Sequence, residues 1–179
     1  MLALWLDHDK ILLCGGVSYD FDHISSEAFL FDSRSDAPAG TKKLGNNLMG
    51  TRFEKLPFMH VRRYSHMGVV MTIESLKYVF VFGGRTEGDQ IIQACEKYSV
   101  TERKWKKIAP MAVARSTGFS LVFKSRIYVF GGYSGKSKRS KKIECYWPEK
   151  DYWETLDVLS LVTLDQIAQG YRNGFIVLH

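Results

Sequence analysis

The sequence lacks the features of several protein classes. It has no uninterrupted apolar run of about 18 residues, the length that a transmembrane helix needs. Its first residues, MLALWLDHDK, contain neither the basic segment nor the cleavage site of a signal peptide. It also has no Asn-x-Ser/Thr sequon, no CxxC pair and no HExxH motif, so neither N-glycosylation nor a local zinc site is predicted.

Cysteine is scarce as well. Cys14, Cys95 and Cys145 lie far apart, each in an apolar or alternating segment. This pattern predicts three buried thiols in a reducing compartment, and therefore a cytoplasmic protein, with the nucleus as the alternative. The net charge of +6 is modest, and five of the 25 Lys and Arg residues lie in the segment KSKRSKK, residues 136–142.

A nucleotide-binding loop is also missing, although residues 126–137, RIYVFGGYSGKS, look like one. A P-loop has the spacing G-x-x-x-x-G-K-[ST] and leads into a helix. Here Phe130 stands five residues before Gly135, and the following segment IECYW alternates as a strand does. The glycine pair at 131–132 therefore needs another explanation.

That explanation is an internal repeat. The segments KILLCGG, YVFVFGG and RIYVFGG end in glycine pairs at 15–16, 83–84 and 131–132. In the last two units a tyrosine follows the first glycine by 15 residues, and a tryptophan follows the tyrosine by 7. The first unit has Phe31 and Phe53 at these positions, with an insert of about 15 residues between them. Several features at one period indicate a repeat architecture.

This pattern resembles the kelch repeat. The resemblance implies an all-β fold: a kelch-type β-propeller of about three and a half four-stranded antiparallel blades, which is an incomplete propeller. The expected blades are about 1–59 with a loop insertion at 33–51, about 60–111, about 112–159, and a half blade at 160–179. Ten residues are expected to build the scaffold: Gly15, Gly16, Gly83, Gly84, Tyr98, Trp105, Gly131, Gly132, Tyr146 and Trp153.

The turn residues between apolar stretches predict the strands of the two regular units. In the second unit they are about 67–72, 77–83, 93–99 and 104–108; in the third they are about 117–123, 126–131, 142–147 and 152–156. An open array of blades leaves unpaired edges, so we expect further blades or self-association to cover them.

The resemblance further implies a non-catalytic protein-interaction module, whose partner is another protein. The family suggests an acidic peptide, a ubiquitin-ligase substrate or a cytoskeletal protein. Because family members bind through loops after the second strand and before the first, eight partner-binding candidates follow: Arg63, Tyr64, Arg85, Thr86, Arg115, Ser116, Tyr133 and Ser134. For Arg63 and Arg115, a structural role in bridging blades is an equal alternative.

Two other functions are alternatives. Some kelch-like propellers are copper oxidases or sugar-acid isomerases, but a copper site needs converging His and Tyr ligands, and no histidine recurs in the repeat. We therefore expect no catalytic residue, cofactor or metal, and we expect His66 at the surface. Binding of nucleic acid or another anion through residues 136–142 is the second alternative, but no aromatic residue is interleaved there to stack on bases. A solvated loop is the expected role of that segment.

Overall fold

The computed structural model describes residues 1–20, 22–34, 52–135 and 138–156. These residues form three four-stranded antiparallel sheets, which confirms the predicted all-β fold of four-stranded blades. The predicted insertion lies outside the described residues from residue 35 onward, as does the predicted half blade at 160–179. Among the described residues, no helix is long and apolar enough to cross a membrane.

Each sheet uses four consecutive strands. The first contains β1 (Leu2–Asp7), β2 (Lys10–Cys14), β3 (Ala28–Asp32) and β4 (Phe53–Leu56). The second contains β5 (Met67–Ile73), β6 (Leu76–Phe82), β7 (Cys95–Ser99) and β8 (Lys104–Ile108), with a short 3-10 helix, η1 (Glu87–Asp89), between β6 and β7. The third contains β9 (Phe119–Phe123), β10 (Arg126–Phe130), β11 (Ile143–Trp147) and β12 (Tyr152–Leu156). The predicted strand ends of the second and third units agree with these bounds to within two residues.

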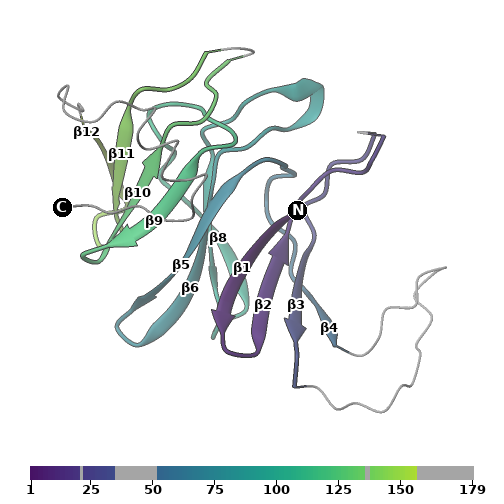
Figure 1. The fold of residues 1–179 in the computed structure, drawn as a ribbon. Coiled ribbons are helices and arrows are strands. Elements are labelled where there is room, and N and C mark those ends of the chain that lie inside the picture. The colour runs from purple at the N-terminus through teal and green to yellow at the C-terminus, as the bar shows by residue number, and fades with distance from the viewer. Residues whose placement is uncertain (21, 35–51, 136–137, 157–179) are drawn as a thin grey trace.

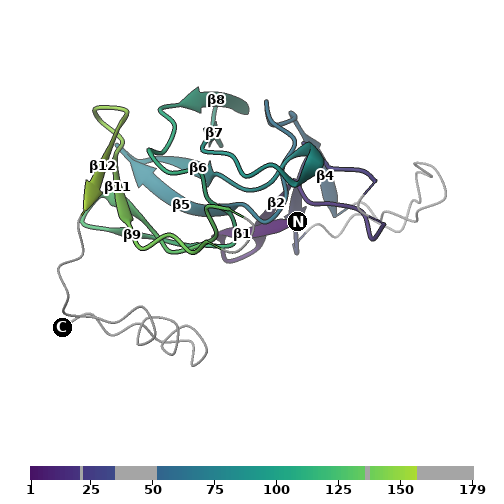
Figure 2. The same cartoon turned by 90° about the horizontal axis from the view of Figure 1, so that it is seen from above.

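The sheets stand side by side as propeller blades do (Figure 1). Strand order within each sheet follows the chain. The first strands of neighbouring sheets are in contact, β1 with β5 and β5 with β9, whereas the fourth strands lie around the outside when the molecule is viewed from above (Figure 2). Because the chain repeats this path, loops of the same kind emerge at the same end of every sheet.

The second strand of a sheet is apolar because neighbouring sheets cover both of its faces. In β6, Val79 and Val81 join the core shared with the first sheet, while Phe80 and Phe82 join the core shared with the third. Successive side chains of a strand point to opposite faces, so a continuous apolar run serves two cores at once. Burial of one such side chain contributes about 1.5–3 kcal/mol.

The hairpins at the far end of the sheets close through tight two-residue turns. Between β5 and β6, both Glu74 and Ser75 have positive φ, of 49° and 66°. Between β9 and β10, Lys124 and Ser125 do the same, with φ of 47° and 59°. Two consecutive positive φ values characterise the type I′ turn, whose twist matches that of antiparallel strands.

The paired aromatic residues lie where the repeat predicts. Tyr98 is opposite Trp105, and Tyr146 is opposite Trp153, with ring centroids 5.1 and 5.0 Å apart. Each tryptophan indole donates a hydrogen bond to the preceding sheet: Trp105 Nε1 to the carbonyl oxygen of Pro57 at 2.9 Å, and Trp153 Nε1 to that of Ala109 at 2.8 Å. The tryptophans therefore seal the cores and also fasten neighbouring sheets.

The glycine pairs allow the chain to pass close to the next sheet. Gly83 has a φ of 56°, and a Cβ atom there would lie 2.2 Å from the carbonyl oxygen of Arg115. Gly15 has a φ of 59° and would place its Cβ 2.6 Å from the carbonyl oxygen of Arg63. Glycine alone accommodates both this backbone conformation and this approach.

Candidate functional site: buried arginine pairs and an exposed loop face

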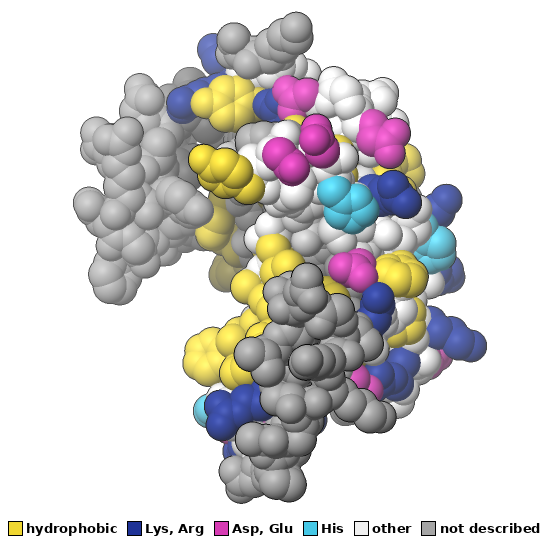
Figure 3. All heavy atoms as spheres, turned by 90° about the vertical axis from the view of Figure 1, so that its right-hand side faces the viewer, with side chains coloured by type: hydrophobic (Ala, Val, Ile, Leu, Met, Phe, Trp, Pro, Cys, Tyr) yellow, Lys and Arg dark blue, Asp and Glu magenta, His cyan; other side chains and the backbone are white. Residues whose placement is uncertain are grey.

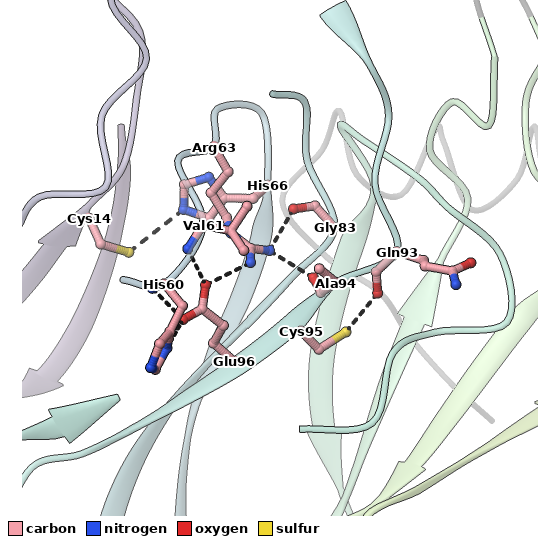
Figure 4. Close-up of polar contacts among 10 residues, drawn as sticks. All are labelled: Cys14, His60, Val61, Arg63, His66, Gly83, Gln93, Ala94, Cys95 and Glu96. Carbon is pink, nitrogen blue, oxygen red and sulfur yellow. Dashed lines mark hydrogen bonds and ion pairs between the residues drawn. The ribbon is translucent and has the colours of Figure 1, made fainter. Parts of the chain in front are cut away.

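Arg63 and Arg115 make the same buried set of contacts in successive sheets. Arg63 donates through Nη1 to the carbonyl oxygens of Gly83 and Ala94, and through Nη2 to Glu96, all at 2.8 Å (Figure 4). Glu96 also accepts hydrogen bonds from the backbone N–H groups of His60 and Val61, at 2.7 and 3.1 Å. Both charged side chains are fully buried.

The third sheet repeats this arrangement. Arg115 donates to the carbonyl oxygens of Gly131 and Lys142, at 3.1 and 2.9 Å, and to Glu144 at 2.5 Å. Glu144 accepts the backbone N–H of Ala112 at 2.6 Å. We call each arginine with its glutamate a staple, Arg63–Glu96 and Arg115–Glu144, because the pair joins the loop before the first strand to the third strand and to both ends of the loop between the second and third strands.

The staples leave no accessible guanidinium at residues 63 and 115. Both arginines are 0% exposed, so of the two roles that the sequence left open for them, the burial favours the structural one. The backbone carbonyl oxygens of Arg63 and Arg115 also accept hydrogen bonds from the backbone N–H groups of Gly16 and Gly84 in the preceding sheet, each at 2.9 Å. A staple thereby fixes one sheet internally and also docks it on its neighbour.

His66 is buried rather than exposed, which corrects the expectation drawn from the sequence. Its Nε2 lies 3.6 Å from Sγ of Cys14, across the junction of the first and second sheets (Figure 4). Burial lowers the pKa of His66 to about 3 and raises the pKa of Cys14 to about 12. A neutral imidazole therefore meets a protonated thiol, which suits a packed junction. All three cysteines are free and buried.

The remaining candidates lie on loops at one end of the sheets, a surface that we call the loop face. Two backbone bridges organise it: Tyr64 pairs with Arg85 in the second sheet, and Ser116 pairs with Tyr133 in the third. Arg85 Nε donates to Ser116 Oγ at 3.1 Å and so links the two bridges. The structure thus brings Tyr64, Arg85, Ser116 and Tyr133 into one row.

Asp89 organises the part of the loop face that belongs to the second sheet. It accepts hydrogen bonds from the Tyr64 hydroxyl and from Nη1 of Arg85. These contacts occupy the Arg85 guanidinium, whose side chain is only 17% exposed. An open hollow of about 500 Å³ adjoins them, lined by Ile24, Tyr64, Thr86, Gly88 and Asp89.

The corresponding part of the third sheet carries free positive charge instead. Arg139 is exposed, and its guanidinium lies over the Tyr133 ring, 5.5 Å from the centroid. Ser134 closes the same loop, its backbone N–H donating to the carbonyl oxygen of Lys138 at 2.8 Å. Tyr133 and Ser134 are half-buried, whereas Ser116 is fully buried and cannot touch a partner.

Five of the eight candidates therefore share an accessible surface: Tyr64, Arg85, Thr86, Tyr133 and Ser134. Sequence reasoning missed Glu96, Glu144 and Asp89, and it considered Arg139 only as part of the basic segment 136–142. The two glutamates were detectable, because they stand 48 residues apart like the glycines. Asp89 and Arg139 do not recur in the repeat, and only the folded loops show their contacts. Within the described ranges, no group of three or more His, Cys, Asp or Glu residues could hold a metal ion.

Comparison with known proteins agrees with this architecture. The model of the Kelch motif matches residues 114–157. Kelch-like protein 11 from Homo sapiens is 25% identical over 171 residues, which cover 95% of this chain and 21% of that protein. Kelch-like protein 9 from Mus musculus is 40% identical over 73 residues, which cover 40% of this chain and 12% of that protein.

A third relative is alpha-scruin from Limulus polyphemus, 34% identical over 84 residues, which cover 44% of this chain and 9% of that protein. The chain thus spans about a fifth or less of the length of these curated relatives. With three blade-like sheets, the recurring glycine pairs and the Tyr–Trp pairs, it is a partial propeller. The Kelch motif match and the Kelch-like relatives support the assignment of this chain to the kelch-repeat family, as a partial domain.

Proposed function

We propose that this chain is a non-catalytic protein-interaction module that presents its loop face to a partner protein. One observation carries the proposal: the bridged row of Tyr64, Arg85 and Tyr133 stands at the end of a rigid scaffold. Tyrosine and arginine are enriched among the residues that dominate binding energy at protein interfaces. A row fixed by backbone bridges also loses little conformational entropy on binding.

The partner classes follow from the family resemblance and from the chemistry of the row. A ubiquitin-ligase substrate or a cytoskeletal protein is proposed by resemblance alone. An acidic peptide is proposed from the exposed basic loop, since the buried charges of Arg63 and Arg115 are already matched by Glu96 and Glu144. The arginine and lysine side chains of the third sheet would then supply the carboxylate contacts.

The test compares the two ends of the scaffold. A photo-crosslinking amino acid is placed at Thr86 or Ser134 on the loop face, or at Ser75 or Ser125 in the opposite turns. Each crosslinker-bearing chain is incubated with extract from the source cells, and the proteins crosslinked to it are identified and quantified by mass spectrometry. A partner captured from Thr86 and Ser134 but not from Ser75 and Ser125 supports the proposal, and equal capture from both ends contradicts it.

The outer faces of the first and third sheets also need cover. Trp5 is 69% exposed on the first, and Phe123 is 48% exposed on the third. We propose that further blades or a second copy of the chain cover these faces, because the same faces are buried where two sheets meet. Light scattering on residues 1–179 tests self-association: a stable monomer would leave further blades as the cover.

A further inference from the structure

The three loops of the loop face that follow the second strands differ in charge. The loop between β2 and β3, residues 15–27, has three acidic residues and neither Lys nor Arg. The loop between β6 and β7, residues 83–94, has two acidic residues and one arginine. The loop between β10 and β11, residues 131–142, has five basic residues and no acidic one. Charge therefore changes from negative to positive from the first sheet to the third.

The folded loops keep this gradient at one end of the molecule. All three emerge at the same end of the sheets (Figure 1). Seen from the side of the first sheet, Asp and Glu side chains gather at that upper end (Figure 3). Asp20, Asp22, Glu87 and Asp89 are all exposed, as are Lys138, Arg139, Lys141 and Lys142 on the third sheet.

Arg139 departs from the repeat at a position that the backbone defines. In all three sheets the residue directly after the glycine pair forms a backbone bridge within the same loop. The bridges are Val17 with Ile24, Arg85 with Ile91, and Tyr133 with Arg139. The second partner is thus isoleucine twice and arginine once. Because isoleucine satisfies the same bridge, the fold does not need the guanidinium of Arg139.

The basic loop also lacks internal neutralisation. Arg85 is paired with Asp89, but no acidic side chain among the described residues pairs with Lys138, Arg139, Lys141 or Lys142. Arg139 is held against Tyr133 by its contact with the ring, and its Nη2 lies 3.5 Å from the Tyr133 hydroxyl. Three unpaired lysines around one oriented guanidinium attract and orient an anion.

We propose that Tyr133, Lys138, Arg139, Lys141 and Lys142 on the third sheet bind a short acidic stretch of a partner protein, with Arg139 and Tyr133 as the selective pair. The acidic loops of the first and second sheets determine where that stretch must end, because carboxylates placed over them would be repelled. The bound segment is acidic over the third sheet and neutral or basic over the other two. This inference rests on the proposed role of the loop face in protein binding.

The gradient also distinguishes a protein segment from a nucleic acid. A nucleic acid carries a phosphate charge at every nucleotide, so a strand that continued past the basic loop would meet Asp89, Glu87, Asp22 and Asp20. A peptide can change its charge along its length and avoid this repulsion. The observations therefore favour a protein ligand over a polyanion.

The test uses three fluorescent probes with the whole chain, residues 1–179. Two are synthetic peptides of about 12 residues, which reach at most about 40 Å when extended. One has glutamates in its first half and Gly and Ser in its second, and the other has glutamates throughout. The third probe is a single-stranded oligothymidine of similar length. Binding is measured by fluorescence anisotropy at low and at physiological salt.

Variants locate the site. Arg139→Ile installs the residue that the other two sheets carry, and Lys104→Ile removes one exposed positive charge at the far end of β8 as the matched control. We expect Arg139→Ile to weaken binding of the half-acidic peptide about tenfold or more, and Lys104→Ile to leave it within about twofold. Unchanged unfolding midpoints verify that both variants fold.

A charge reversal tests the role of the acidic loops. In the variant Asp20→Lys/Asp22→Lys, the fully acidic peptide is expected to gain affinity more than the half-acidic one does. Equal affinity of both peptides for the wild type, an unaffected Arg139→Ile variant, or no binding of the half-acidic peptide would each overturn the inference. Tighter binding of oligothymidine than of either peptide would overturn it in favour of nucleic acid. Crosslinking confined to the loop face would still support the proposed interaction role after any of these failures.

Discussion

The first sheet and the second sheet have the same strand order and, apart from an irregularity between Trp5 and Asp7 in β1, the same register, but they are fastened differently. In the second, Glu96 on β7 pairs with Arg63, and Tyr98 packs against Trp105. In the first, the equivalent positions hold Phe29, Phe31 and Phe53, and the last two rings pack 5.1 Å apart. A hydrogen-bonded staple and an indole donor in one sheet are thus replaced by plain aromatic packing in the other.

This difference shows which features the fold requires. Apolar alternation and the glycine pair occur in all three sheets, so they suffice to build a blade. The staples and the indole hydrogen bonds occur only in the second and third, so they add fixed geometry to a blade that apolar packing already forms. Buried ion pairs often contribute little net stability and yet are costly to break, and a staple of this kind fits that behaviour.

The largest effect is expected from breaking a staple. Glu96→Ala leaves the Arg63 charge buried and removes the acceptor of two backbone N–H groups. We expect the free energy of unfolding to fall by about 3–5 kcal/mol, measured by urea denaturation with tryptophan fluorescence. The exposed pair Glu27–Lys55 provides the control, since Glu27→Ala should cost less than about 1 kcal/mol.

A double substitution sharpens the same comparison. Arg63→Met with Glu96→Phe gives the second sheet the apolar residue that the first sheet carries at Phe29. We expect the double variant to recover most of the stability lost in Glu96→Ala, because no buried charge is left unpaired. A double variant less stable than Glu96→Ala would show that the staple itself is essential for folding.

The aromatic positions should differ in a similar way. Trp105 is 8% exposed and donates a hydrogen bond to Pro57, whereas Phe53 is 38% exposed. Trp105→Ala should lower the free energy of unfolding by about 3–5 kcal/mol, and Phe53→Ala by about 1–2 kcal/mol, because less apolar area is buried. Equal losses in thermal or urea denaturation would mean that the first sheet is as tightly sealed as the second.

Two equivalent glycines differ in whether a neighbouring sheet covers them. Gly83 and Gly131 have nearly the same φ, 56° and 57°, but no described atom lies within 4 Å of a Cβ built on Gly131. Alanine at either site suffers backbone strain of about 1–2 kcal/mol. Gly83→Ala should cost about 1–2 kcal/mol more in urea denaturation, because it also collides with the Arg115 carbonyl. Equal costs would indicate that another group covers Gly131.

The smallest effect concerns pH and the junction between the first two sheets. With a pKa lowered to about 3, His66 stays neutral in the folded protein, whereas the unfolded chain binds a proton below about pH 6.5. Stability is therefore unaffected above that pH and falls as the pH is lowered toward 3. Between about pH 7.5 and pH 5, His66 should account for a loss of about 2 kcal/mol.

His66→Gln tests this expectation, because glutamine is polar but does not titrate. The variant should lose about 2 kcal/mol less than the wild type over the same pH range in urea denaturation. His8→Gln, at an exposed residue, should leave the pH dependence unchanged. If both variants match the wild type, protonation of His66 does not limit stability.

Much of the fold was predictable because the repeat is local in sequence. The glycine pairs and the Tyr–Trp spacing located the strands of the second and third units to within two residues, since period-2 alternation and turn residues act over short distances. His66 was misplaced for the opposite reason. It precedes a strand like a surface residue, and only its approach to Cys14, 52 positions away in the chain, buries it.

The candidate site was predictable in part. The repeat indicated which loops share a face, and Tyr64, Arg85, Thr86, Tyr133 and Ser134 do lie on accessible loops of that face. The sequence left a structural role equally open for Arg63 and Arg115 and did not set Ser116 apart from the accessible candidates; all three residues are buried. Whether an arginine is exposed depends on the glutamate that faces it, and Glu96 is 33 residues from Arg63.

The sequence by itself determined the blade, because alternating apolar strands, glycine pairs and turns depend on neighbouring residues. It also determined that residues 131–132 serve the scaffold and not a nucleotide. Only the tertiary structure decided which charged side chains form ion pairs inside the molecule and which stay exposed and available to a partner. Ion pairs form between residues far apart in the chain, so the burial of Arg63 and Arg115 and the exposure of Arg139 follow from how the sheets pack.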